Sequence, residues 1–175
     1  MSSSSSLAIS RRGLLRSLLA WPLAGLAAAP KEPIAGLERW GSGELRRFGL
    51  LIYEVTLWAR EEPTRPPLAL DLKYRRAVSG RKIAEFSIAE LRELGGFEAE
   101  LERWREAMVR IFPDARAGDR LVCLYLPEGA HFYRNGRWLG GILEPEFAKA
   151  FFGIWLDART SDPSLRAALL RSPKR

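Results

Sequence analysis

The chain has 175 residues, of which 47% are apolar and 28% charged, and its formal net charge is +7. This composition is typical of a globular domain with a sizeable core and excludes an intrinsically disordered chain. Three of the 28 basic residues and no acidic residue lie before residue 30, so the remainder has 25 basic against 21 acidic residues. No block of Lys and Arg interleaved with aromatic residues accompanies this small excess, so we expect no nucleic-acid partner.

Residues 1–29 have the pattern of a bacterial export signal. The segment Ser10–Arg16 (SRRGLLR) resembles a twin-arginine motif, and an apolar run follows from Leu18 to Ala29. This run is shorter than the ~20 residues that span a bilayer. Its small residues predict cleavage near 27–29. We therefore expect a periplasmic or otherwise exported protein without a stable membrane span. The alternative is an uncleaved leader that anchors the chain to the inner membrane.

The rest of the sequence is expected to form one domain. We place a linker at residues 30–36, the domain at 37–170 and a short tail at 171–175. Cys123 is the only cysteine, which excludes an internal disulfide, and its apolar neighbours predict a buried thiol. His131 is the only histidine, and no His/Cys cluster has ligand spacing, so we expect no metal and no cofactor.

Three strands are predicted first. Residues 37–40 and 45–60 are expected to be strands joined through Gly41 and Gly43, since β-branched and aromatic residues dominate the second of them. Residues 68–74 alternate apolar and polar side chains, which predicts a third strand with one buried face.

Helices are predicted next. Ser79 can cap a turn over 81–86, and the capping-box pattern Ser87–Glu90 predicts the start of a further helix that stops at Gly95. A clearer helix is expected over 97–112. Its apolar residues recur at intervals of three and four, which predicts a face packed on the core. These residues are Phe97, Leu101, Trp104, Met108 and Ile111.

The C-terminal part returns to strands and then to helices. We expect a strand at 121–126 and a hairpin at 130–143 with a type I′ turn at Asn135–Gly136. Helices are expected over 145–155 and 163–170. Strands, helices, strands and helices in this order predict an α+β fold, with an antiparallel sheet covered by helices on one face.

Two features could form a binding site. Arg46 and Arg47 precede the apolar and aromatic run Leu50–Trp58, and a guanidinium at the mouth of an apolar cleft suits a ligand with an apolar body and an anionic head. Phe151 and Trp155 belong to an aromatic helix that could roof such a cleft. The alternatives are a solvated arginine pair and aromatic residues that only fill the core.

Three segments carry a resemblance to the bacterial chalcone isomerase-like family. They are Gly41–Arg46 with Gly49–Trp58, Ile111–Asp114 with Gly118–Leu121, and Phe147–Leu156 with Thr160–Arg166. The resemblance implies the open-faced β-sandwich of that family, with a cleft between sheet and helices. It also implies a role for one arginine. In the plant isomerases an arginine stabilises a phenolate oxyanion, and in the fatty-acid-binding members an arginine and a tyrosine hold a carboxylate.

By this resemblance Arg46 matches the family arginine best and Tyr53 the tyrosine. On a continuous strand, however, Arg47 rather than Arg46 shares a face with Tyr53, unless a bulge at Gly49 restores Arg46. Both arginines therefore remain candidates.

Three functions follow. The first is an exported, non-catalytic binder of a fatty acid or similar apolar anion, held by Arg46 or Arg47, Tyr53, Phe151 and Trp155. The second is an intramolecular lyase or isomerase in which an arginine stabilises an oxyanion and Tyr53 or Tyr133 moves a proton. The third is an envelope interaction domain with a filled core. The plant enzymes have a threonine where this chain has Tyr53, which favours binding over catalysis, so we assign no catalytic residue.

Overall fold

The computed structural model describes residues 33–171. The predicted leader, linker residues 30–32 and tail residues 172–175 lie outside the described part of the chain. Six strands form one antiparallel sheet in chain order: β1 (Glu38–Arg47), β2 (Leu50–Ala59), β3 (Leu68–Tyr74), β4 (Arg120–Leu126), β5 (Gly129–Arg134) and β6 (Arg137–Ile142). The helices are α1 (Gly80–Leu94), α2 (Leu101–Ile111), α3 (Pro145–Leu156) and α4 (Pro163–Leu169).

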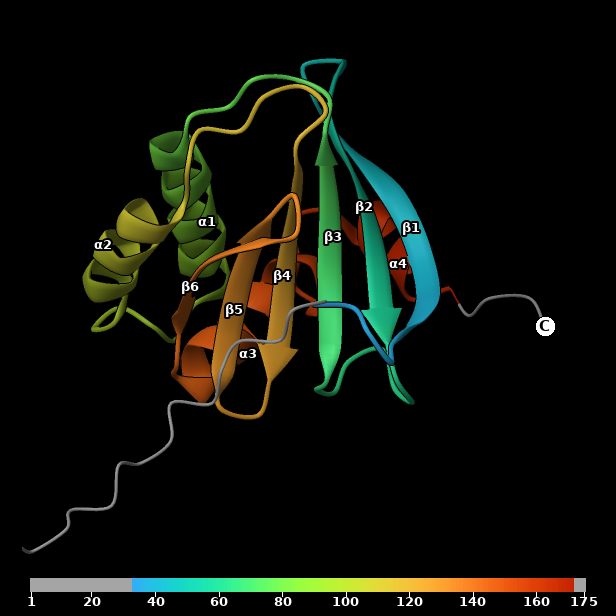
Figure 1. The fold of residues 1–175 in the computed structure, drawn as a ribbon. Helices are drawn as coiled ribbons and strands as arrows, with labels where there is room; N and C mark the ends of the chain where they lie inside the picture. Colours follow the sequence, from blue (N-terminus) through green and yellow to red (C-terminus); the bar gives the residue numbers. More distant parts are fainter. Residues whose placement is uncertain (1–32, 172–175) are drawn as a thin grey trace, which may run out of the picture.

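The helices lie on one side of the sheet (Figure 1), which confirms the predicted α+β fold. α3 packs on β4 and β5, α4 packs on β1 and β2, and α1 packs against α2 and α3. Alternation along β3 directs Leu68, Leu70 and Leu72 into the core that the sheet shares with the helices. No helix within residues 33–171 is long and apolar enough to cross a membrane.

The first hairpin differs from the prediction. β1 continues through Gly41 and Gly43, and the turn lies at Phe48–Gly49, where φ is 51° and 74°. The predicted strand over 45–60 is therefore wrong, because it runs across this turn. The two β1 glycines have another role: a Cβ on Gly41 would overlap the backbone carbonyl of Leu169 in α4. These glycines thus permit close packing of α4 on β1 rather than a turn.

The region after β3 also differs. α1 is one continuous helix whose N-cap is Ser79, as expected: its hydroxyl accepts a hydrogen bond from the Lys82 amide at 3.3 Å. Ser87 lies within this helix and donates to the Ile83 carbonyl at 2.9 Å, so the predicted capping box is wrong. The helix ends before Gly95, whose φ of 74° suits a residue without a Cβ.

Two other local predictions are confirmed in their main features. Leu101, Trp104 and Met108 form the buried face of α2, although this helix begins at Leu101 and not at the expected residue 97, so Phe97 precedes it. Asn135 and Gly136 make the β5–β6 turn with φ of 50° and 80°, the left-handed values that a type I′ turn requires.

We predict that Gly41→Ala lowers the free energy of unfolding by about 2 kcal/mol or more, because the added methyl group must push α4 away from β1. Urea unfolding measures this loss. Ser42→Ala is the matched control, since Ser42 is the exposed neighbour on the same strand and should change stability by less than about 0.5 kcal/mol. Equal stability of the two variants would contradict the close approach.

Candidate functional site

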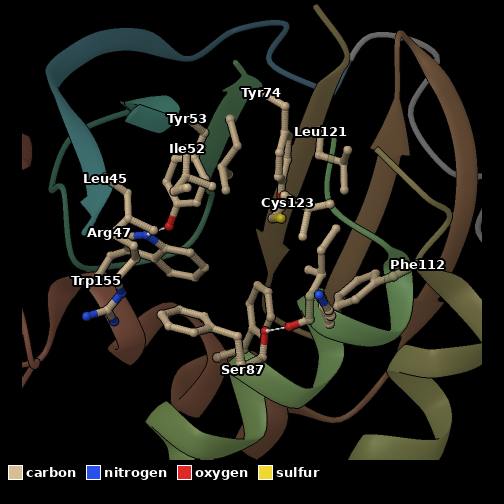
Figure 2. Close-up of a pocket in the computed structure, with 16 residues that line it drawn as sticks. Leu45, Arg47, Ile52, Tyr53, Tyr74, Ser87, Phe112, Leu121, Cys123 and Trp155 are labelled. Atoms are coloured by element: carbon tan, nitrogen blue, oxygen red, sulfur yellow. Dashed lines mark hydrogen bonds between the residues drawn. The ribbon is translucent and has the colours of Figure 1, made fainter. Parts of the chain in front are cut away.

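A cavity of about 280 Å³ lies between the sheet and α1, with the end of α3 closing one side. Figure 2 shows Tyr53, Tyr74 and Cys123 on the sheet side, and Ser87 and Trp155 on the helix side. The walls are largely apolar. The lining residues are Leu45, Arg47, Ile52, Tyr53, Leu72, Tyr74, Val78, Lys82, Ile83, Phe86, Ser87, Phe112, Leu121, Cys123, Phe151 and Trp155.

The structure separates the two arginines of β1. Leu45 pairs with Tyr53 across the hairpin and faces the helices, so strict alternation directs Arg46 outward and Arg47 inward. Arg47 lines the cavity, whereas Arg46 lies outside the lining and donates to Glu44 at 3.0 Å on the exposed side. A register shift between Leu45 and Arg46 leaves Ile52 as the extra residue on β2, which brings Ile52 into the cavity wall.

Arg47 is held at the edge of the cavity by two partners. Its Nη2 donates to Oε1 of Glu90 at 3.2 Å, and its guanidinium carbon lies 5.0 Å from the centre of the Phe86 ring. The other carboxylate oxygen of Glu90 accepts from the Ser161 hydroxyl at 2.6 Å. Nearly half of the Arg47 side chain remains exposed to solvent. The guanidinium therefore has further donors for a second anion at the mouth.

Tyr53 lies deeper. Its hydroxyl accepts a hydrogen bond from Nε1 of Trp155 at 3.1 Å, which leaves its own proton available for a ligand oxygen. The Tyr74 ring packs against Tyr53 with centroids 5.5 Å apart. Burial raises the pKa of both hydroxyls above their ordinary value of 10.0, although the Trp155 hydrogen bond opposes this for Tyr53. Burial likewise raises the pKa of the Cys123 thiol. All three groups are therefore protonated at neutral pH.

Four of the five predicted site residues come together here: Arg47, Tyr53, Phe151 and Trp155 line one cavity, and Arg46 does not. Tyr133, considered as a proton donor, packs with Val122 and Leu124 in a separate cluster on the opposite face of the sheet. His131 pairs with Leu124 and lies two residues before Tyr133, so it shares that face by alternation. Neither residue reaches the cavity.

Sequence reasoning missed two charged residues. The Ser87–Glu90 pattern predicts a capping box, and it gives no sign that the partner of Glu90 is Arg47, 43 residues away in β1. Lys82, on the first turns of α1, lines the cavity, and none of the ion pairs among the described residues includes it. The signal available in the sequence was that Lys82 follows the predicted N-cap Ser79 by three residues, which puts it on the first turn of the helix. Across residues 33–171, no group of three or more His, Cys, Asp or Glu side chains is placed to hold a metal ion.

The buried tyrosines predict a loss of stability at high pH. Their pKa is raised in the folded state and ordinary in the unfolded state, so their stabilisation is present below about pH 10 and falls above it. We expect the free energy of unfolding to fall by about 1.4 kcal/mol per pH unit for each such tyrosine above that pH. In Tyr74→Phe the fall should be shallower. Urea unfolding between about pH 8 and about pH 11 measures this, and parallel curves for Tyr74→Phe and the parent would contradict it.

Comparison with known proteins identifies the family of this chain. The family model described as chalcone isomerase-like matches residues 57–171. An uncharacterized protein of Haemophilus influenzae is 29% identical over 164 residues, which cover 91% of this chain and 79% of that protein. The crystal structure of an Arabidopsis thaliana fatty-acid-binding protein aligns with a TM-score of 0.63 at 10% identity, covering 81% of this chain and 90% of that one. The last similarity shows a shared fold. Since the family model covers most of the chain, including β3 to α4, the protein belongs to the chalcone isomerase-like family.

Proposed function

We propose that this protein is exported and binds a fatty acid or similar apolar anion without catalysing a reaction on it. One observation carries the proposal: an apolar cavity has Arg47 at its edge and the Tyr53 hydroxyl inside it. An anionic head would accept hydrogen bonds from the guanidinium, while the apolar body would lie among the side chains of the sheet and α1. The fold shared with the Arabidopsis fatty-acid-binding protein is consistent with this use.

The cavity volume limits the ligand. Its 280 Å³ is roughly twice the ~150 Å³ of an apolar cavity that binds benzene. The space therefore suits a medium-length acyl chain or a compound with two rings. A longer chain would have to extend through the mouth. Lys82 and Arg47 would both be available to the head group, since both line the cavity.

The lining favours binding over catalysis. Among the described residues that line the cavity there is no carboxylate and no imidazole, the usual groups for proton transfer. The raised pKa of Tyr53, Tyr74 and Cys123 keeps each of them protonated, which suits hydrogen-bond donors and not bases or nucleophiles. Export is supported by the twin-arginine-like motif of residues 10–16 and by the short apolar run that follows.

Substitution of the two arginines tests the proposal. We expect Arg47→Gln to weaken binding of a fluorescent fatty acid about tenfold, because a charge-assisted hydrogen bond is lost. Arg46→Gln, the matched control, should bind like the parent, since Arg46 lies outside the cavity. Mass spectrometry of a solvent extract from the periplasmic fraction tests both export and ligand. Equal binding by both variants and an extract without lipid would overturn the proposal.

The Arg47–Glu90 ion pair generates a second prediction. The Glu90 carboxylate already occupies part of the guanidinium and repels an incoming anion. We therefore expect Glu90→Gln to bind a fatty acid several-fold more tightly than the parent does. The variant and the parent should bind the uncharged fatty alcohol with the same affinity. Isothermal titration measures both affinities.

Glu44→Gln is the control for this experiment, because it removes the corresponding partner of Arg46 outside the cavity. It should leave both affinities unchanged. A weaker fatty-acid affinity of Glu90→Gln would mean that the carboxylate orients Arg47 for binding rather than competing with the ligand.

A further inference from the structure

The tip of the β1–β2 hairpin (Arg46–Leu50, hereafter the hairpin tip) exposes two large apolar side chains. Phe48 is fully exposed and Leu50 is 46% exposed. They are separated only by Gly49, so they form one projecting apolar point. Two large apolar side chains so close together at a projecting turn form a small apolar patch, which is suited to a contact surface.

The backbone makes Phe48 more unusual. Phe48 and Gly49 have φ of 51° and 74°, nearly the values of Asn135 and Gly136 in the β5–β6 turn. Asparagine tolerates this left-handed conformation, whereas a bulky residue there is a genuine outlier. Two turns of one sheet thus share a geometry, but only one carries the residue type that suits it. Neither burial nor turn chemistry accounts for Phe48.

Cationic residues surround the hairpin tip. Arg46 and Arg47 belong to it, and the Arg75 amide donates to the Ile52 carbonyl at 2.8 Å, which places the end of β3 beside it. The start of α1 adds Lys82 at the same cavity. The exposed cations at this end of the molecule (Figure 1) include Arg46, Arg47, Arg75, Arg76, Arg81 and Lys82.

Acidic residues offset only part of this charge. Glu44 pairs with Arg46, Glu90 with Arg47 and Glu54 with Arg75. The Asp114 carboxylate accepts from the Gly80 amide close to the start of α1. None of the ion pairs within residues 33–171 includes Arg76, Arg81 or Lys82, so this end remains basic. Figure 1 shows that the β1–β2 turn and the β3–α1 connection project from the same end of the sheet.

We propose that the hairpin tip docks on the surface of an anionic lipid bilayer, with Phe48 and Leu50 among the acyl chains and the surrounding cations at the head groups. This combination of a small apolar insertion and basic residues is what interfacial membrane binding requires. A protein partner fits less well, because a stable interface buries about 800 Å² on each side and this apolar point has two side chains.

The position of the hairpin tip gives the docking a consequence. Arg47 and Ile52, which flank the exposed residues, also line the cavity, so the mouth would face the bilayer. An apolar ligand could then pass between membrane and cavity with little exposure to water. The docking itself does not depend on which ligand the cavity holds.

A local probe tests the proposal in the full chain, whose N-terminal apolar run could itself bind lipid. An environment-sensitive fluorophore is attached to Leu50→Cys in a Cys123→Ala background, so that the introduced thiol is the only one in the chain. With vesicles of equal parts phosphatidylcholine and phosphatidylglycerol, its emission should shift to the blue and resist an aqueous quencher. The same label on Leu143→Cys, another exposed leucine position, should not respond. Vesicles of phosphatidylcholine alone should give a weaker response that added salt does not change.

Phe48→Asn in the Leu50→Cys background completes the test. It gives the hairpin tip the residue of the matching β5–β6 turn, so folding is retained, and the vesicle concentration for half the response should rise about tenfold. A Leu50 label that stays as exposed to water as the Leu143 label overturns the proposal, whether or not the chain sediments with the vesicles. It is also overturned if that label is shielded by a cell extract and not by vesicles, which would indicate a protein partner.

Discussion

The site depends on the separation of α1 from the sheet. α1 packs against α2 and α3, and the aromatic residues of α3 fix how closely these helices approach the strands. Phe151 contacts Phe132 of β5 and Trp155 of α3 at ring-centre distances of 5.4 and 5.5 Å. α3 therefore cannot move closer to β5 without losing the edge-to-face packing of Phe151 on Phe132. The space left between α1 and β1–β4 is the cavity. Core packing in one half of the domain therefore creates the opening in the other.

Strand alternation then decides which charge enters this space. β1 ends at Arg47, immediately before the turn at Phe48–Gly49. Alternation directs the Arg47 side chain to the face of the sheet that the helices cover. Glu90 of α1 lies outside the cavity lining and meets the guanidinium from the helix side, so the ion pair joins strand and helix beside the cavity. A partly exposed pair of this kind contributes little to stability. Its larger effect is electrostatic, because any anion at the mouth shares Arg47 with a resident carboxylate.

Some local features were predicted well from the sequence, because periodicity and backbone preference alone determine them. The apolar stripe of α2 and the Asn135–Gly136 turn follow from periodicity and left-handed backbone preference. The first turn was missed because phenylalanine is a poor turn residue, while Gly41 and Gly43 imitated a turn that tertiary packing on α4 explains instead. Glu90 was missed for a related reason. Its partners Arg47 and Ser161 lie 43 and 71 residues away, and a local capping pattern offered a simpler account.

The burial of Cys123 has a consequence beyond the core. Its sulfur is shielded from bulk solvent yet lies on the cavity wall, so a reagent reaches it only through the space that a ligand would fill. This geometry keeps the thiol out of reach of a cysteine on another chain. The same geometry makes the alkylation rate of the single thiol an intrinsic measure of whether the cavity is empty or occupied.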